Sequence, residues 1–176
     1  MQKIKINKQL EIWYLEDYNP VAKVLIHQLK IKKNPFPLDI YLKSYQKYLK
    51  KQFNRSILCI LNANPLLNLL QVSFPNIPYF ILFDKINYKY KQAYAKNKSL
   101  ICKEIDIKHN ILKRIKFNKY TTNRIIIFDD IWTSGNTIKT CYRLLLQNIE
   151  FKNYKIIIFV LFKTFYKEIT NNLYLI

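Results

Sequence analysis

Apolar side chains occur along the chain in short uninterrupted runs, each bounded by polar or turn residues. The clearest runs are Ile57 to Leu61, Tyr79 to Phe83, Ile125 to Phe128 and Ile156 to Phe162. Runs of this length are typical of strands in a parallel sheet that other elements cover on both faces. They are too short to cross a bilayer, which needs about 20 residues, so no membrane span is expected.

Between these runs the apolar positions recur at helical spacing. The segments predicted to be helical are Val21 to Leu29, Ile40 to Phe53, Pro65 to Gln71, part of Lys98 to Ile115, and Ile138 to Leu146. Near the N-terminus, Ile4 to Tyr14 predicts a short strand or hairpin. The alternation of strands and helices predicts an α/β fold, a doubly wound and mainly parallel sheet with helices on both faces.

The length of 176 residues suits one hydrophobic core. No internal repeat or linker divides the chain. We therefore expect a single domain over 1–176, with the N-terminal hairpin and helices in 1–55 and the core of the sheet in 56–176.

The formal charge of +19 has two explanations. Clustered basic residues neutralise phosphates in nucleic acids, but only four of the 30 basic residues are arginines and the lysines are spread along the chain. An AT-rich coding composition explains the same enrichment in Lys, Asn, Ile, Tyr and Phe. We favour this second explanation and expect weak nucleic-acid binding at most.

The three cysteines, Cys59, Cys102 and Cys141, are widely spaced and form no CxxC pair. They predict buried thiols rather than disulfides or a zinc site. The N-terminal residues show no signal-peptide core. These features favour a cytoplasmic protein.

The segment Ile125 to Thr137 combines a short apolar strand, two carboxylates, a hydroxyl-rich turn and a helix. Ligands of doubly wound sheets bind at the carboxyl edge, where such a strand ends. The turn contains Gly135, the only glycine of the chain, and a glycine there allows a tight bend or a close approach to a ligand. The backbone N–H groups that lead into the helix, with the hydroxyls of Thr133, Ser134 and Thr137, predict a phosphate site.

Asp129 and Asp130 would repel a phosphate unless they face a different part of the ligand. Vicinal ribose hydroxyls, which donate hydrogen bonds to carboxylates, fit that position. A phosphorylated ribose therefore satisfies both halves of the segment. The alternative is a strand, a turn and a capped helix, in which the two carboxylates only solvate the edge of the sheet.

Ile125 to Thr137 resembles the thirteen-residue phosphoribosyl pyrophosphate signature of type I phosphoribosyltransferases. The similarity covers the apolar run, both carboxylates, the Thr-Ser-Gly turn and the closing Thr. The resemblance implies the type I phosphoribosyltransferase fold, with Asp129 and Asp130 on the ribose hydroxyls. It places the 5′-phosphate in a loop made of Thr133, Ser134, Gly135, Asn136 and Thr137. It also implies magnesium, held by the ligand rather than by the protein directly.

Two further stretches resemble the ComF family of competence proteins: the helix Val24 to Lys30, and the region from Gln92 to Glu104. They lie in the family's order along the chain. The family's N-terminal zinc module and its basic segment after the second core strand are missing. In place of that segment, the turn after Leu61 offers Ala63 and Asn64 as a candidate pyrophosphate loop without a nearby arginine.

The resemblance implies a ComF-like protein that binds phosphoribosyl pyrophosphate with magnesium, transfers its ribosyl group to a nitrogen acceptor, and is linked to DNA uptake. The alternative is a non-enzymatic protein of the same fold that senses a ligand or assists DNA uptake. A purine-salvage enzyme is a third reading, which the segment after Ile156 to Phe162 does not favour because it offers few groups for ring stacking. The sequence indicates no acceptor, no catalytic residue and no oligomeric state.

Overall fold

The computed structural model describes residues 1–61, 66–85, 105–111, 124–133, 135–148, 151 and 153–164. The elements in these ranges, in chain order, are β1 (Gln2–Lys5), β2 (Leu10–Asp17), α1 (Pro20–Lys30), α2 (Phe36–Phe53), β3 (Ile57–Leu61), α3 (Leu67–Ser73), β4 (Tyr79–Lys85), β5 (Ile105–Ile107), β6 (Arg124–Trp132), α5 (Asn136–Gln147) and β7 (Lys155–Lys163).

The strands form one seven-stranded sheet in the order β1-β2-β7-β6-β3-β4-β5. The inner neighbours are all parallel, whereas β1 and β5 pair antiparallel at the two edges. The predicted α/β class with a mainly parallel sheet is confirmed, and the architecture is consistent with a type I phosphoribosyltransferase fold. The N-terminal hairpin belongs to the same sheet, because β2 pairs with β7.

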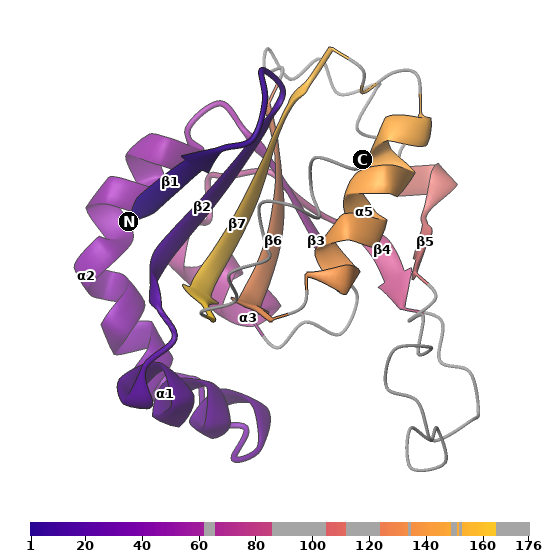
Figure 1. Ribbon diagram of the computed structural model, residues 1–176. Helices are drawn as coiled ribbons and strands as arrows, with labels where there is room; N and C mark the ends of the chain where they lie inside the picture. Colours follow the sequence, from indigo (N-terminus) through magenta and orange to yellow (C-terminus); the bar gives the residue numbers. More distant parts are fainter. Residues whose placement is uncertain are drawn as a thin grey trace, which may run out of the picture.

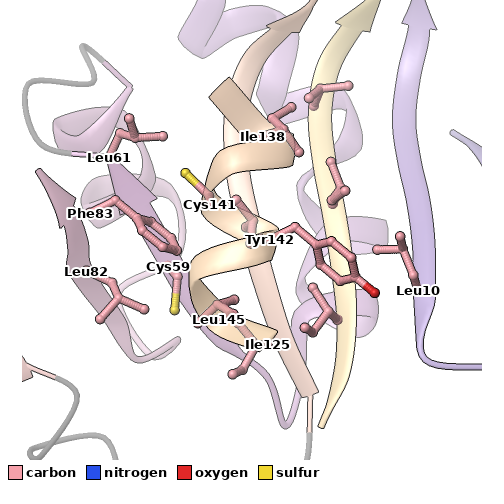
Figure 2. Packing of buried hydrophobic residues seen from close by; sticks show 14 of the residues in the cluster. Leu10, Cys59, Leu61, Leu82, Phe83, Ile125, Ile138, Cys141, Tyr142 and Leu145 are labelled. Carbon is pink, nitrogen blue, oxygen red and sulfur yellow. The ribbon is translucent and has the colours of Figure 1, made fainter. Parts of the chain in front are cut away.

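Helices cover both faces of the sheet, as predicted (Figure 1). On one face α1, α2 and α3 pack on side chains such as Leu58, Phe128 and Phe159. On the other face α5 covers the alternate positions of the same strands through Ile138, Cys141, Tyr142 and Leu145 (Figure 2). The central strands β6 and β7 are therefore buried on both sides, which explains their uninterrupted apolar runs.

Local sequence explains where the first helix starts. Asn19 is the N-cap of α1, and its side chain accepts a hydrogen bond of 2.8 Å from the N–H of Ala22. Pro20 occupies the first helical position, where its missing N–H has no cost. α1 then runs to Lys30, whose side chain reaches the carboxyl edge of the sheet.

The segment Lys98 to Ile115, part of which was expected to be helical, also contains a strand. Ile105–Ile107 is a strand, not part of a helix, and it pairs antiparallel with β4. His109 to Ile111 are helical, and the remaining residues of that segment lie outside the described ranges. Within the described residues no helix is long and apolar enough to cross a membrane.

Other corrections concern the ends of elements. β6 does not end at Phe128 but continues to Trp132, because it remains paired with β7 as far as Lys163. α2 begins at Phe36 rather than at Ile40, and α5 begins at Asn136 rather than at Ile138. The extension of β6 places Asp129 and Asp130 inside the strand, so the sheet fixes their backbone.

Candidate functional site

The candidate site lies at the carboxyl edge of the sheet, where β6 extends beyond β3. The pairing of β3 with β6 ends at Ile60 and Phe128, and β6 continues alongside β7. The parallel strands β2, β7, β6 and β3 all end on this side. This edge is the usual binding position for ligands of open α/β sheets.

Asp130 is the most buried carboxylate of the described residues, with 4% of its surface exposed. Its Oδ1 accepts a hydrogen bond of 2.8 Å from the N–H of Ile131. Its Oδ2 lies 2.5 Å from Nζ of Lys30, at the end of α1. Among the described residues, Oδ2 makes no hydrogen bond of good geometry, so charge attraction to Lys30 is what holds it.

Asp129 lies beside Asp130 and is partly buried. Its Oδ1 accepts a hydrogen bond of 2.9 Å from the N–H of Asp130. Burial and the neighbouring carboxylate of Asp130 raise the pKa of Asp129 to about 7, while Lys30 opposes that rise. The two carboxylates therefore share a site that resists a second negative charge.

The residues after β6 form the predicted turn into a helix. Gly135 has φ +73° and ψ 0°, the left-handed conformation, and it is the N-cap of α5. Glycine has no side chain to cap the first turn, so the N-cap leaves the N–H groups of that turn available to an anion. The carbonyl of Gly135 accepts from the N–H of Lys139 at 2.8 Å, which anchors the helix start.

Trp132 fixes the approach to this turn. Its side chain is buried, with 1% exposed, and its carbonyl accepts hydrogen bonds from the N–H and the Oγ1 of Thr164 at 3.0 and 2.9 Å. The last residue of β6 is thereby tied to the residue that follows β7. Its indole ring lies 3.0 Å from the position that a Cβ on Gly135 would occupy.

The structure brings together part of the predicted residue set. Asp129, Asp130 and Gly135 lie on β6 and at the start of α5, with Thr133 exposed and Thr137 half-buried. Asn136 is the first residue of α5. Ser134, Ala63 and Asn64, together with the stretch from Gln92 to Glu104, lie outside the described residues.

Sequence reasoning did not place Lys30 in the site. Lys30 ends the stretch that resembles ComF, whereas the histidine of that stretch, His27, is exposed on α1. The only available signal was a basic residue at the end of an amphipathic helix, and that signal does not identify an ion pair with a strand 100 residues later.

Asp130 is buried, so its carboxylate does not solvate the sheet edge. The ion pair with Lys30 compensates its charge. Among the described residues, no group of three or more His, Cys, Asp or Glu side chains could hold a metal ion by itself.

No protein-family model matches the chain, and no curated protein matches it. The solved structures that resemble it include two adenine phosphoribosyltransferases. One is adenine phosphoribosyltransferase from Leishmania tarentolae, at 14% identity and a TM-score of 0.41, with 93% of this chain and 94% of that chain covered. The other is adenine phosphoribosyltransferase from Leishmania donovani, at 13% identity and the same TM-score of 0.41, with coverage of 93% and 86%.

Proposed function

We propose that the chain binds a phosphorylated ribose, and specifically phosphoribosyl pyrophosphate, at the carboxyl edge of β6. The observation that carries this proposal is the order of groups along one strand end. Asp129 is partly buried and Asp130 is buried, and after four intervening residues a left-handed glycine, Gly135, precedes a twelve-residue helix.

The phosphate half of the ligand belongs at the turn. The N–H groups of the first turn of α5 and the helix dipole together favour an anion. Gly135 allows the backbone to approach that anion closely, because it carries no Cβ. In this proposal Thr133, Ser134 and Thr137 add hydroxyl donors to the 5′-phosphate.

The ribose half belongs at the carboxylates. Ionised carboxylates accept hydrogen bonds from vicinal hydroxyls, and such charged hydrogen bonds contribute about 1.5–3 kcal/mol each. Because its pKa is raised to about 7, Asp129 is partly protonated near neutral pH. Hydroxyl donors favour the ionised carboxylate. Ribose binding near neutral pH is therefore expected to release protons.

Magnesium fits this arrangement as an ion carried by the ligand. Mg²⁺ is commonly bound by substrate phosphates and waters, so the pyrophosphate of the ligand would hold it while Asp129 and Asp130 face the ribose hydroxyls. When bound, the ion would neutralise charge on the pyrophosphate. The protein's own contribution is to orient the ribose through the carboxylates and the 5′-phosphate through the turn.

The reaction proposed for this site is ribosyl transfer. The bond between C1 of the ribose and the pyrophosphate oxygen breaks, and the pyrophosphate leaves with the bonding electrons. A nitrogen acceptor then forms the new bond to C1 with its lone pair and releases a proton to solvent. The ComF-like assignment and the link to DNA uptake belong to this proposal and rest on the sequence resemblance alone.

A non-enzymatic role remains as a second candidate because of where the arginines lie. Arg55 and Arg124 lie at the amino-terminal ends of β3 and β6, opposite the site, and Arg143 is exposed on the third turn of α5. Within the described residues, no arginine therefore lies beside the carboxylates to stabilise departing pyrophosphate. The same site would then bind the ligand as a sensor.

The test is isothermal titration with phosphoribosyl pyrophosphate and Mg²⁺, followed by an assay of pyrophosphate release over a panel of nitrogen acceptors. Binding with release supports the transferase, and binding without release supports the sensor. The D129N/D130N variant is expected to lose affinity for ribose 5-phosphate and to retain inorganic phosphate. Wild-type protein that binds neither sugar phosphate would contradict both candidates.

A further inference from the structure

Lys30 brings a positive charge to the candidate site from a separate element. Its Nζ lies 2.5 Å from Oδ2 of Asp130, and its charge also acts on Asp129. Two carboxylates and one ammonium therefore share this edge. A ligand with several phosphate charges needs more positive charge here than the backbone turn alone supplies.

The two partners of this ion pair differ in freedom. Asp130 is fixed by the strand, and its side chain is 6% exposed. Lys30 lies in the last turn of α1 and is 42% exposed. Its four-carbon stem has many rotamers, whereas the short side chain of Asp130 has few. If the pair opens, Lys30 is the partner that moves.

Ribose binding requires such an opening. Hydroxyls that donate to Oδ2 of Asp130 must take the place of the ammonium, because a carboxylate oxygen at 2.5 Å from Nζ has little room for another donor on that side. The displaced ammonium then lies next to a ligand that carries phosphate. Attraction to that phosphate offsets the loss of the pair with Asp130.

We propose that Lys30 exchanges partners on ligand binding, from Asp130 to a phosphate group of the phosphorylated ribose. This inference rests on the proposed function and adds to it a binding residue from α1. The exchange couples hydroxyl recognition to phosphate recognition. The hydroxyls replace Lys30 as the partner of Asp130, and the phosphate replaces Asp130 as the partner of Lys30. No covalent step is involved.

The experiment measures the affinity of ligands for the K30M variant, which keeps the length of the stem but removes its charge. The probes are phosphoribosyl pyrophosphate with Mg²⁺ and ribose 5-phosphate, each by isothermal titration. The expected result is a loss of roughly 10- to 100-fold for phosphoribosyl pyrophosphate, the range of a charged hydrogen bond. K30R should retain most of the affinity, because the positive charge is kept.

K23M is the matched control. Lys23 lies on the same helix and is exposed, so removing its charge tests the general effect of the basic surface. Its affinity should stay close to that of the wild type. An equal loss in K23M and K30M would overturn the assignment, because long-range attraction would then explain both.

Whether K30M binds phosphoribosyl pyrophosphate more weakly, more tightly or equally well shows which role Lys30 has. Tighter binding by K30M would mean that Lys30 only occludes Asp130, and unchanged binding would mean that it has no part in the site; either result overturns the inference. Failure of the wild-type protein to bind any sugar phosphate would instead overturn the proposed function itself.

Loss of the pair also leaves Asp130 buried without its cation, which can disturb the fold. The D130N background removes this ambiguity, because Lys30 there has no carboxylate at position 130 to pair with. We expect K30M to weaken phosphoribosyl pyrophosphate binding further in that background. If K30M has no effect there, Lys30 acts only through Asp130 and the exchange is wrong.

Discussion

The indole ring of Trp132 lies where a side chain on Gly135 would have to be. An ideal Cβ at position 135 would be 3.0 Å from Cε2, Cζ2 and Nε1 of that ring. The left-handed backbone of Gly135, with φ +73°, is a second reason for glycine at this position. Trp132 and Gly135 therefore specify the turn together, and neither can be changed without consequence for the other.

The G135A variant tests the role of this turn in phosphate binding. We expect weaker binding of both inorganic phosphate and ribose 5-phosphate, and a loss of stability of about 1 kcal/mol or more from the strained backbone alone. Thermal-shift titration with both ligands measures the two effects. Compared with W132L as its parent, the W132L/G135A double variant should lose less than G135A loses relative to the wild type, because the steric part is gone and only the backbone strain remains. If G135A binds both ligands as the wild type does, the turn is not a phosphate site.

The strands could be predicted because a strand buried on both faces appears in the sequence as an uninterrupted apolar run. Every apolar run named from the sequence is a strand, and the runs at β3 and β7 have nearly the same bounds in the structure. Cys59 and Cys141 are buried free thiols, as predicted. The edge strand β5 was missed because three residues, Ile105 to Ile107, are too few to show a period.

Helix starts were less predictable, and proline is the reason at α2. The expected start was Ile40, and Pro35 and Pro37 precede it, but proline is compatible with the first turn of a helix. Pro35 is the N-cap residue and Pro37 lies within that turn, so α2 begins at Phe36. Burial of this helix through Leu38 and Leu42 outweighs the local breaking tendency.

Part of the candidate site could likewise be predicted from the sequence, and part of it could not. Asp129, Asp130 and Gly135 lie within seven residues of the chain, so their order alone indicates a ligand site. The pair between Lys30 and Asp130 is not local, and no periodicity or motif within one segment reports it. The raised pKa of Asp129 depends on burial by the packed elements, which the sequence does not contain explicitly.

Arg124 joins the end of α2 to the start of β6. Its Nη2 donates hydrogen bonds to the carbonyls of Gln52 at 2.9 Å and Asn54 at 2.5 Å. We expect R124A to lower the free energy of unfolding by about 1–3 kcal/mol, because charged hydrogen bonds to these carbonyls are lost. Urea unfolding measures the change. R143A, which removes an exposed arginine from α5, should change stability by less than about 0.5 kcal/mol; an equal effect of both variants would contradict the role of Arg124.

The charge of +19 predicts weak binding to DNA that depends strongly on salt. Lysines spread over a surface attract the phosphate backbone without reading bases, so affinity should fall steeply as salt increases. Fluorescence anisotropy with single- and double-stranded oligonucleotides, over a several-fold range of salt, measures this dependence. Affinity that persists at high salt, or that prefers one sequence, would require a dedicated nucleic-acid site.

The raised pKa of Asp129 makes the stability of the fold depend on pH. Burial and the charge of Asp130 raise its pKa to about 7 in the folded protein, whereas an unfolded aspartate titrates near 4. The charged groups that act on it are Asp130 on its own strand and Lys30 from α1, and Asp129 in turn helps to raise the pKa of the Cys141 thiol on α5. Because the folded state binds the proton more tightly, this group's favourable contribution is complete below about pH 4 and is lost as the pH rises through about 7.

The D129N variant removes that titration and keeps an oxygen that can accept from the N–H of Asp130. Its stability relative to the wild type should therefore increase between about pH 4 and 7, and should level off above that range. The gain above pH 7 is expected to be roughly 1–4 kcal/mol, since one pKa unit corresponds to about 1.4 kcal/mol and the charge is shared with Asp130. Urea unfolding of both proteins at pH 5, 6, 7 and 8 measures the difference. A difference that is constant over this range would show that Asp129 titrates normally, and the carboxylate pair would then hold two full charges at neutral pH with Lys30 as their counter-ion.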